Sequence, residues 1–402
     1  LDMSLNTVSN SECLSLREPA YIGPLLGEIG RQAASADATR SIDSELIVAI
    51  KKNDVMRLSA SPEIAGLDET FVNIGNELQA VAGQCTSTAW CLWNHLCTFH
   101  HFAGLLGKKN IDLLADVVAK HEWVCFPAGA ASKVSGSQKG TDNIELNGVA
   151  SFGSGSRYAD WAGVVFKEGT DQELKFAFAD LRLPGVEIEQ TWQAMSLRAS
   201  ATDHIHYTNA TVPSKLVVPM PYRYREHFRD PATEMIHHRY REDWVAISVM
   251  WLGAMATGLV EAAFRETIEN IQDRVAIVGT KMSDKSTIHI NLGKVRALLN
   301  TASDTVYSAL NETDSRIEMK IIPTEDDYFR QCASGMQAVQ LCDEALNLIL
   351  RTLGGNGLRE GTNFERRYRD FQAMPLHING HVDRITEQLG RLSLGMETQN
   401  PF

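Results

Sequence analysis

The twelve histidines of this chain are its main candidates for proton transfer, because a free imidazole titrates near neutral pH. His377 can act as a base toward a bound substrate and as a hydrogen-bond donor toward an oxygen atom. A capping or buried histidine bonded to the backbone is the alternative interpretation. His95 lies on an apolar stretch and can face a substrate pocket, but the nearby His100 and His101 compete for that role, as does a place in the core.

The spacing of histidines and cysteines argues against a metal centre. His204 and His206 alternate on one face of a predicted strand, which permits a metal ion, but no third ligand follows at a useful spacing. There are seven cysteines and no CxxC motif, and Cys85, Cys91 and Cys97 lie about 240° apart around a helix. We therefore predict no metal and reduced, mostly buried thiols.

The stretch FGSGSRYADW, residues 152–161, places Gly-Ser-Gly inside a β-rich region. A turn needs one glycine, whereas a loop that lies flat against a planar ligand has more reason to lose its side chains. Ser154, between two glycines, offers a hydroxyl group to such a ligand. We therefore predict a ligand-contacting loop here.

Composition and charge exclude several classes of partner. At 44% hydrophobic and 22% charged residues, the chain resembles an ordinary soluble globular protein. Its net charge of −12 argues against binding to nucleic acid or to an anionic membrane surface, since either needs a basic face. No apolar run reaches the roughly 18 residues of a membrane span, and the first residues do not resemble a secretory signal. We expect a cytoplasmic protein.

Hydrophobic periodicity divides the chain into three parts: 1–121, 122–230 and 231–402. The first part is helical. The second contains short β-rich runs, and Asn147-Gly148 between two of them predicts a hairpin turn. The third has four long amphipathic helices, which are predicted over 243–272, 286–310, 326–353 and 378–394.

This order of helices, strands and helices predicts an α+β fold and argues against a Rossmann fold, in which strands and helices alternate. The sequence GGNGLREG, residues 354–361, is rich in glycine like a dinucleotide-binding loop, but it follows a predicted helix and not a strand. The pair Gly354-Gly355 fits the end of a helix.

Three segments in chain order resemble the acyl-CoA dehydrogenase superfamily. GVASFGSGSRYADW, from residue 148, is similar to the strand and loop that lie against the flavin in that fold. WQAMSLRASATDHIHYTNATVPSKLVV, from 192, is similar to its strand pair, and LGGNGLREGTNFERRYRDFQAMPLH, from 353, to its C-terminal segment. The resemblance implies an N-terminal helical domain, a middle β-barrel domain and a C-terminal four-helix bundle.

The resemblance also implies a flavin site. Phe152 is expected to cover one face of the flavin ring, Ser154 to hydrogen-bond near its N5 atom, and Trp161 matches the tryptophan of the flavin-facing strand. Cys125 and Phe126 occupy the place of the first flavin-contacting loop.

Two further groups are implied near the rest of the cofactor. Arg274 lies in the region where the superfamily uses arginine on the pyrophosphate. Gly354 and Gly355 resemble a glycine segment that packs on the cofactor of a neighbouring subunit, with a plain helix end as the alternative.

The superfamily includes two chemistries. Dehydrogenases remove a proton with a carboxylate, but the usual place of that base holds Asn379 here, and a second place falls near Asp243. Flavin-dependent monooxygenases instead carry a histidine eight residues after the arginine of an "RD" pair, which is His377 here. CTSTAW, residues 85–90, also resembles a helix of that branch. These matches favour a monooxygenase, with a dehydrogenase or oxidase using Asp243 as the alternative.

In the monooxygenase branch the resemblance implies reduced FAD or FMN from a separate flavin reductase, and O2. A C4a-(hydro)peroxyflavin then hydroxylates a small aromatic or amine-bearing substrate. The candidate catalytic residues are His377, Ser154 and His95. The superfamily also implies a homotetramer. A non-catalytic flavin-fold binding or scaffold protein is the remaining alternative.

Overall fold

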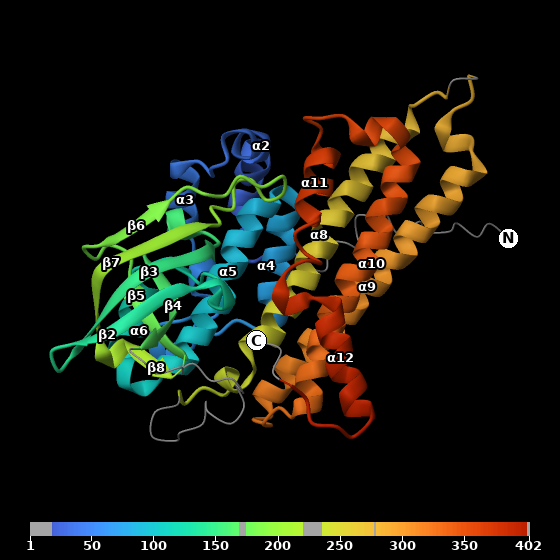
Figure 1. Ribbon diagram of the computed structural model, residues 1–402. Helices are drawn as coiled ribbons and strands as arrows, with labels where there is room; N and C mark the ends of the chain where they lie inside the picture. Colours follow the sequence, from blue (N-terminus) through green and yellow to red (C-terminus); the bar gives the residue numbers. More distant parts are fainter. Residues whose placement is uncertain (1–17, 169–173, 220–234, 277–278, 400–402) are drawn as a thin grey trace.

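The computed structural model describes residues 18–168, 174–219, 235–276 and 279–399, so the predicted boundary near residue 230 and Cys13 lie outside the described residues. Helices come first, strands follow, and long helices end the chain (Figure 1). The N-terminal α-helices are α2 (Gly23–Thr39), α3 (Ser44–Lys51), α4 (Phe71–Gln84), α5 (Thr86–Leu106) and α6 (Ile111–Ala119). The C-terminal ones are α8 (Trp244–Gln272), α9 (Ser286–Glu318), α10 (Glu325–Leu353), α11 (Asn363–Phe371) and α12 (Val382–Ser393).

The strands form one sheet, in the order β6-β7-β3-β2-β4-β5-β8, with β1 beside β4. Their bounds are β1 (Val124–Cys125), β2 (Lys133–Lys139), β3 (Asn143–Gly153), β4 (Trp161–Glu168), β5 (Leu174–Asp180), β6 (Val186–Glu189), β7 (Asp203–Pro213) and β8 (Val217–Pro219). Among the described strands, β6 and β8 end the path without pairing to each other. The predicted closed barrel is therefore not confirmed.

The predicted hairpin at Asn147-Gly148 is wrong, because both residues lie inside β3. Gly148 has a φ of +127°, and the register of β3 against β7 shifts between Leu146 and Gly148. A β-bulge uses the same conformational freedom of glycine as a tight turn, so this sequence signal does not separate the two. The chain reverses instead between β2 and β3, around Gly140.

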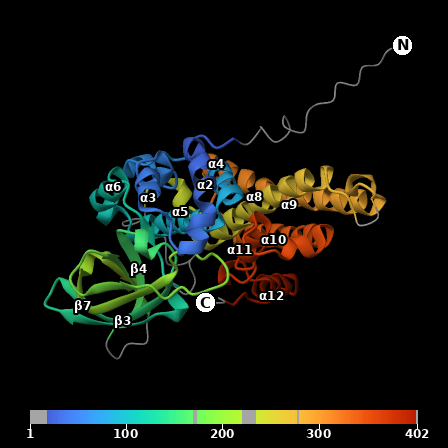
Figure 2. The ribbon, with the colours of Figure 1, turned by 90° about the horizontal axis from the view of Figure 1, so that it is seen from above.

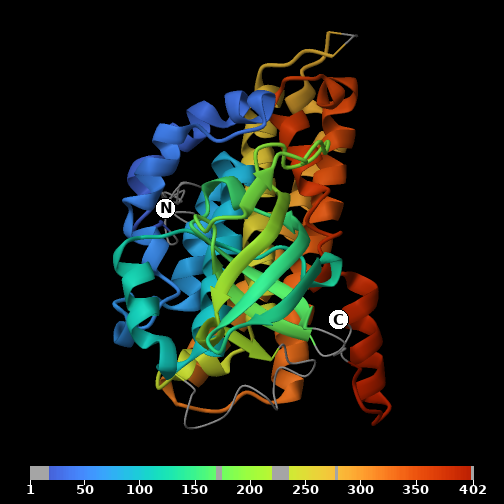
Figure 3. The same cartoon turned by 60° about the vertical axis from the view of Figure 1, so that its left-hand side comes forward.

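Helix α5 lies at the centre of the molecule. It packs on β1 on one side and on α8 and α11 on the other. Figures 1 and 2 show α4 and α5 between the strands and the long helices, and Figure 3 shows the sheet in front of them. Every residue of α5 apart from Gly104 and Leu105 is buried. Side chains on different faces of α5 therefore reach the sheet and the long helices from one rigid element.

The long helices α8, α9 and α10 run side by side, and α4 packs on α8 (Figure 1). Glycines allow these close approaches: a Cβ atom on Gly258 of α8 would lie 2.1 Å from the Gln79 carbonyl oxygen of α4. Helix α8 has a window with a mean hydropathy of 1.6, long and apolar enough for a membrane span by composition, which sequence inspection had not found. All of that window is buried inside the protein, as is typical of a core helix.

Candidate active site

A chain of hydroxyl groups links the predicted flavin loop to α5. Trp90, on α5, donates a hydrogen bond from its indole Nε1 to the Ser154 hydroxyl at 3.0 Å. Ser154 Oγ lies 3.0 Å from Thr202 Oγ1, which in turn lies 2.7 Å from Ser200 Oγ. All four side chains are buried. The loop is therefore held in one position against α5 and the segment before β7.

The glycines around Ser154 were predicted to let the loop lie flat against a ligand, but the structure shows another reason for them. Gly155 has a φ of +78°, and its amide donates to the Ser200 carbonyl oxygen at 2.8 Å. A Cβ atom on Gly153 would lie 3.2 Å from the Asp203 carbonyl oxygen. The backbone thus approaches its own neighbouring segment closely, and glycine is needed for that packing whatever ligand binds.

The ring of His377 lies beside this network. Its centroid is 5.5 Å from that of Trp90 and 4.9 Å from that of Trp93, both in edge-to-face geometry. His377 Nδ1 accepts a hydrogen bond from the Asn379 amide at 3.3 Å, as the N-cap of a short 3-10 helix at Ile378–Gly380. Both sequence interpretations of His377 therefore apply, since the ring is a cap and also lies among the aromatic side chains of the site.

Burial decides the charge of His377. It lowers the pKa of the imidazole to about 4, with a smaller effect from the positive charge of Arg384. The ring is therefore neutral at pH 7. Because Nδ1 accepts from a backbone amide, the proton of the neutral ring lies on Nε2. Among the described residues Nε2 has no hydrogen-bond partner, so His377 presents an N–H donor.

The segment that carries His377 is fixed to α8. The buried Asn379 side chain donates to the Ser248 hydroxyl at 3.0 Å, and the Ser248 carbonyl oxygen accepts from Trp93 Nε1 at 2.9 Å. Ser248 is a polar residue in an apolar helix, which alone did not identify it as part of a site. These bonds set the position of both His377 and Trp93.

Phe152 is an exposed aromatic residue in an unusual backbone conformation. Its φ is +60° and its side chain is 53% exposed, with its ring edge-to-face with that of Trp192 at 6.4 Å. Apolar side chains at positive φ are rare, and such strain gathers at ligand sites. Phe152 thus offers an apolar ring on the surface next to Ser154.

The other three predicted flavin contacts on the sheet are buried. Cys125 is fully buried on β1, and burial raises the pKa of its thiol. Phe126 packs in an aromatic cluster with Phe102 and Trp244. Trp161 stacks on Phe178 at 4.6 Å. These contacts place all three side chains in the core of the sheet, and their contact with a flavin stays a prediction.

His95 and Asp243 have structural partners. His95 Nε2 lies 3.0 Å from the Met56 carbonyl oxygen, and its Nδ1 accepts from the Val124 amide at 3.0 Å, so neither nitrogen remains for a substrate. The catalytic role expected of His95 stays a prediction, which these bonds do not favour. Asp243 is the N-cap of α8 and accepts from the Val245 amide at 2.7 Å. A carboxylate in that role satisfies the start of a helix.

Arg274, Gly354 and Gly355 lie together at the far end of the long helices. Arg274 follows α8 and donates to the Leu353 carbonyl oxygen at 3.2 Å, and Gly354 begins the 3-10 helix after α10 with a φ of +61°. Nothing lies within 4 Å of a Cβ atom placed on either glycine. The structure thus brings these three predicted residues together on an open surface, away from His377.

The comparisons with known proteins agree with this fold. Residues 250–381 match the family "Acyl-CoA dehydrogenase, C-terminal domain". The chain is 24% identical over 390 residues to the oxygenase component of p-hydroxyphenylacetate 3-hydroxylase from Acinetobacter baumannii, covering 94% of this chain and 88% of that protein.

Two solved structures are similar along almost the whole chain. XiaF from a Streptomyces species, in complex with FADH2 and glycerol, has a TM-score of 0.83 at 18% identity and covers 96% of this chain and 98% of its own. TdsC from a Paenibacillus species, with FMN and indole, has a TM-score of 0.81 at 15% identity, with 94% and 97% covered. The chain thus has the fold of the acyl-CoA dehydrogenases over almost its whole length, and it is similar to proteins named as hydroxylase oxygenase components.

Proposed function

We propose that this protein hydroxylates a small aromatic compound with O2 and a reduced flavin, FADH2 or FMNH2, which a separate reductase supplies. When bound, the reduced flavin supplies the two electrons that turn one atom of O2 into water while the other enters the substrate. The proposal places the reaction next to Phe152, Ser154 and His377.

The described residues fit a planar group that forms hydrogen bonds. A hydroxyl group can take part in three hydrogen bonds, and Ser154 uses two of them, with Trp90 and Thr202. One bond remains for a ligand. The exposed ring of Phe152 and the partly buried ring of Trp192 offer apolar surface beside it. Arg274 and the open glycine backbone at Gly354 suit a phosphate group. They lie at the other end of α8 from Ser248 and His377, so one ligand contacts both places only if it is an extended cofactor or if a second subunit contributes.

One observation supports the proposal most directly, and it concerns Trp90. Its indole N–H binds the predicted flavin loop through Ser154, and the same ring contacts His377. The predicted cofactor residue and the predicted catalytic residue are 223 positions apart in the chain, yet both contact one side chain. Such convergence is expected of an active site at the junction of two parts of a protein.

His377 acts in this proposal as a neutral donor. Its Nε2–H can bind the oxygen of a phenol or phenolate, or an oxygen atom that is being transferred, without carrying charge itself. The flanking rings of Trp90 and Trp93 surround the imidazole with aromatic side chains. An amine would find no carboxylate among these neighbours, so an aromatic substrate is favoured over an amine-bearing one.

The test separates donor, base and dehydrogenase. His377→Gln keeps an N–H donor, so it retains more substrate hydroxylation than His377→Ala, which loses about 100-fold or more in kcat. The measurement is product formation with reduced flavin, O2 and a panel of phenols, indoles and amines. Equal loss in both variants contradicts the donor role. If Asp243→Asn abolishes reduction of the flavin by substrate while His377→Ala does not affect turnover, the protein is a dehydrogenase instead.

We also propose a homotetramer, in which the second subunit lies over Arg274 and Gly354. Large apolar side chains are exposed on the long helices and their connections, namely Ile290, Met319, Ile322 and Leu358. Light scattering on the eluted protein measures the mass, and a monomeric mass at micromolar concentration contradicts this part of the proposal.

A further inference from the structure

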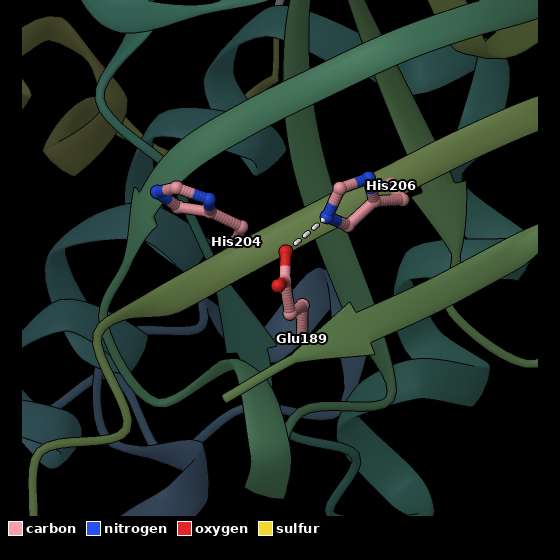
Figure 4. Close-up of side chains that lie close together, drawn as sticks. All are labelled: Glu189, His204 and His206. Atoms are coloured by element: carbon pink, nitrogen blue, oxygen red, sulfur yellow. Dashed lines mark hydrogen bonds and ion pairs between the residues drawn. The ribbon is translucent and has the colours of Figure 1, made fainter. Parts of the chain in front are cut away.

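Three side chains that could hold a metal ion converge on the outer face of the sheet. Glu189 lies at the end of β6, and His204 and His206 lie on the neighbouring β7 (Figure 4). Glu189 is the register partner of His204. Because residues 204 and 206 alternate with the buried Ile205, both imidazoles point to the same outer face.

The distances suit one ion. The ligand atoms of the three residues all lie within 4.8 Å of one another, and His206 Nε2 lies 2.8 Å from Glu189 Oε2. The ligands of a tetrahedral zinc ion are about 3.4 Å apart at bond lengths near 2.1 Å. His204 and His206 are partly exposed and Glu189 is exposed, so a small rotation of these side chains closes the remaining gap.

The donor set selects the kind of ion. Two imidazole nitrogens and one carboxylate oxygen suit Zn²⁺, Co²⁺ or Ni²⁺, whereas Ca²⁺ and Mg²⁺ prefer oxygen ligands alone. Glu187, the register partner of His206, adds negative charge on the same face. An exposed ion pair between His206 and Glu189 contributes little by itself. A cation bound between all three groups would use all three side chains as ligands, whereas the ion pair involves only two of them.

We propose that Glu189, His204 and His206 form a binding site for a divalent transition-metal ion, with Zn²⁺ as the best match and water in the remaining coordination position. The sequence showed only the histidine pair, because the third ligand comes from a different strand and depends on the register of β6 against β7.

The site lies beside the loop that reaches the candidate active site. Two residues after Glu189 lies Thr191, whose hydroxyl accepts a hydrogen bond from the His204 amide at 3.1 Å. The Asp203 carboxylate accepts from the amides of Thr191 and Trp192 at 2.9 and 3.0 Å. An ion that links β6 to β7 therefore holds both ends of the 190–202 loop, which carries Trp192 and Thr202.

The experiment uses the full chain without a polyhistidine tag. Titration with Zn²⁺, followed by calorimetry, is expected to show one ion per chain at micromolar concentration, and Co²⁺ is expected to give visible absorption typical of a nitrogen–oxygen site. The thermal unfolding midpoint rises with added Zn²⁺ and not with Mg²⁺.

Variants locate the site. His204→Ala, His206→Ala and Glu189→Gln are each expected to weaken Zn²⁺ binding by at least about tenfold, and all three residues lie at the surface, where substitution leaves the fold intact. His289→Ala removes a histidine on α9 and is the matched control. If the double variant at His204 and His206 binds Zn²⁺ as the unaltered protein does, or if neither protein binds it at micromolar concentration, the proposal is wrong.

Discussion

Trp90 joins the two halves of the candidate site, because it contacts both Ser154 and His377. Trp90→Phe keeps a ring next to His377 but leaves Ser154 without its donor. We expect weaker binding of reduced flavin, by about tenfold, and a loss of about 1–2 kcal/mol in the free energy of unfolding. Fluorescence titration of the flavin and denaturant unfolding measure the two effects.

The matched control for this variant is Trp123→Phe. Trp123 is also fully buried, but its indole N–H has no partner among the described residues. Its replacement should lower stability through packing and leave flavin affinity unchanged. If both variants bind flavin equally well, the bond between Trp90 and Ser154 has no part in the cofactor site.

The role of single residues was predictable only where a motif carried it. His377 and Ser154 were identified from their segments, and both contact Trp90. The direction of the His377 proton was not predictable, because it depends on the backbone amide of Asn379. His95 was expected to be catalytic, since its type and helix suit that role, but bonds to Met56 and Val124 use both nitrogens.

At the scale of elements, α5 makes the protein sensitive to acid. Burial lowers the pKa of His95 to about 4 and those of His100 and His101 to about 3. In the unfolded chain the same groups take up protons near pH 6.5. The unfolded state therefore binds more protons between about pH 6.5 and pH 4, and the free energy of unfolding falls as the pH is lowered through this window.

Each such group adds about 1.4 kcal/mol per pH unit to the slope, and the buried His377 adds to it as well, whereas Asp370 and Asp314, whose pKa values burial raises to about 7 and about 6, oppose it. Denaturant unfolding at a series of pH values measures the slope, and His101→Phe, which removes one buried imidazole, lowers it by about 1.4 kcal/mol per pH unit. An equal slope in this variant and in the unaltered protein contradicts the burial of the ring.

The periodicity of the chain predicted the elements well. The helix expected over 243–272 is α8, with Asp243 as its cap, and that expected over 326–353 is α10. The helix expected over 378–394 begins only at Val382, because His377 starts a short 3-10 turn first. Helix ends depend on such local caps, while the apolar face that periodicity detects extends over many residues.

At the scale of the whole molecule, Arg369 connects three parts of the chain. It donates to the Met195 carbonyl oxygen at 2.7 Å and to the Asp37 carboxylate of α2 at 2.9 Å, and it pairs with Glu365 on its own helix. Arg369→Leu should lower the free energy of unfolding by about 2–3 kcal/mol, because Glu365 loses its ion-pair partner and Asp37 keeps only the longer ion pair with Arg198 at 3.6 Å.

Thermal unfolding followed by tryptophan fluorescence and by circular dichroism measures this loss and shows whether the parts still unfold together. Arg351→Leu, on the exposed face of α10, is the matched control. A midpoint as low in the control as in the Arg369 variant means that the effect comes from the added leucine and not from the lost contacts.

The arrangement of the sheet was the least predictable level. The alternating pattern identified strands, but their order and register depend on contacts between distant segments. Asn147-Gly148 was therefore assigned to a turn and not to a bulge, and Glu189 could not be placed next to His204. Both errors have one cause, because the sequence pattern of a single strand does not show which residues of another strand pair with it.

The apolar character of α8 has a consequence during synthesis. Its partners α4 and α5 precede it in the chain, whereas α9 and α10 leave the ribosome later. Until α9 and α10 have been made, one side of α8 is exposed to solvent in the nascent polypeptide, although this helix is as apolar as a transmembrane helix. The nascent chain therefore presents this apolar segment before the helices that cover its remaining side are complete.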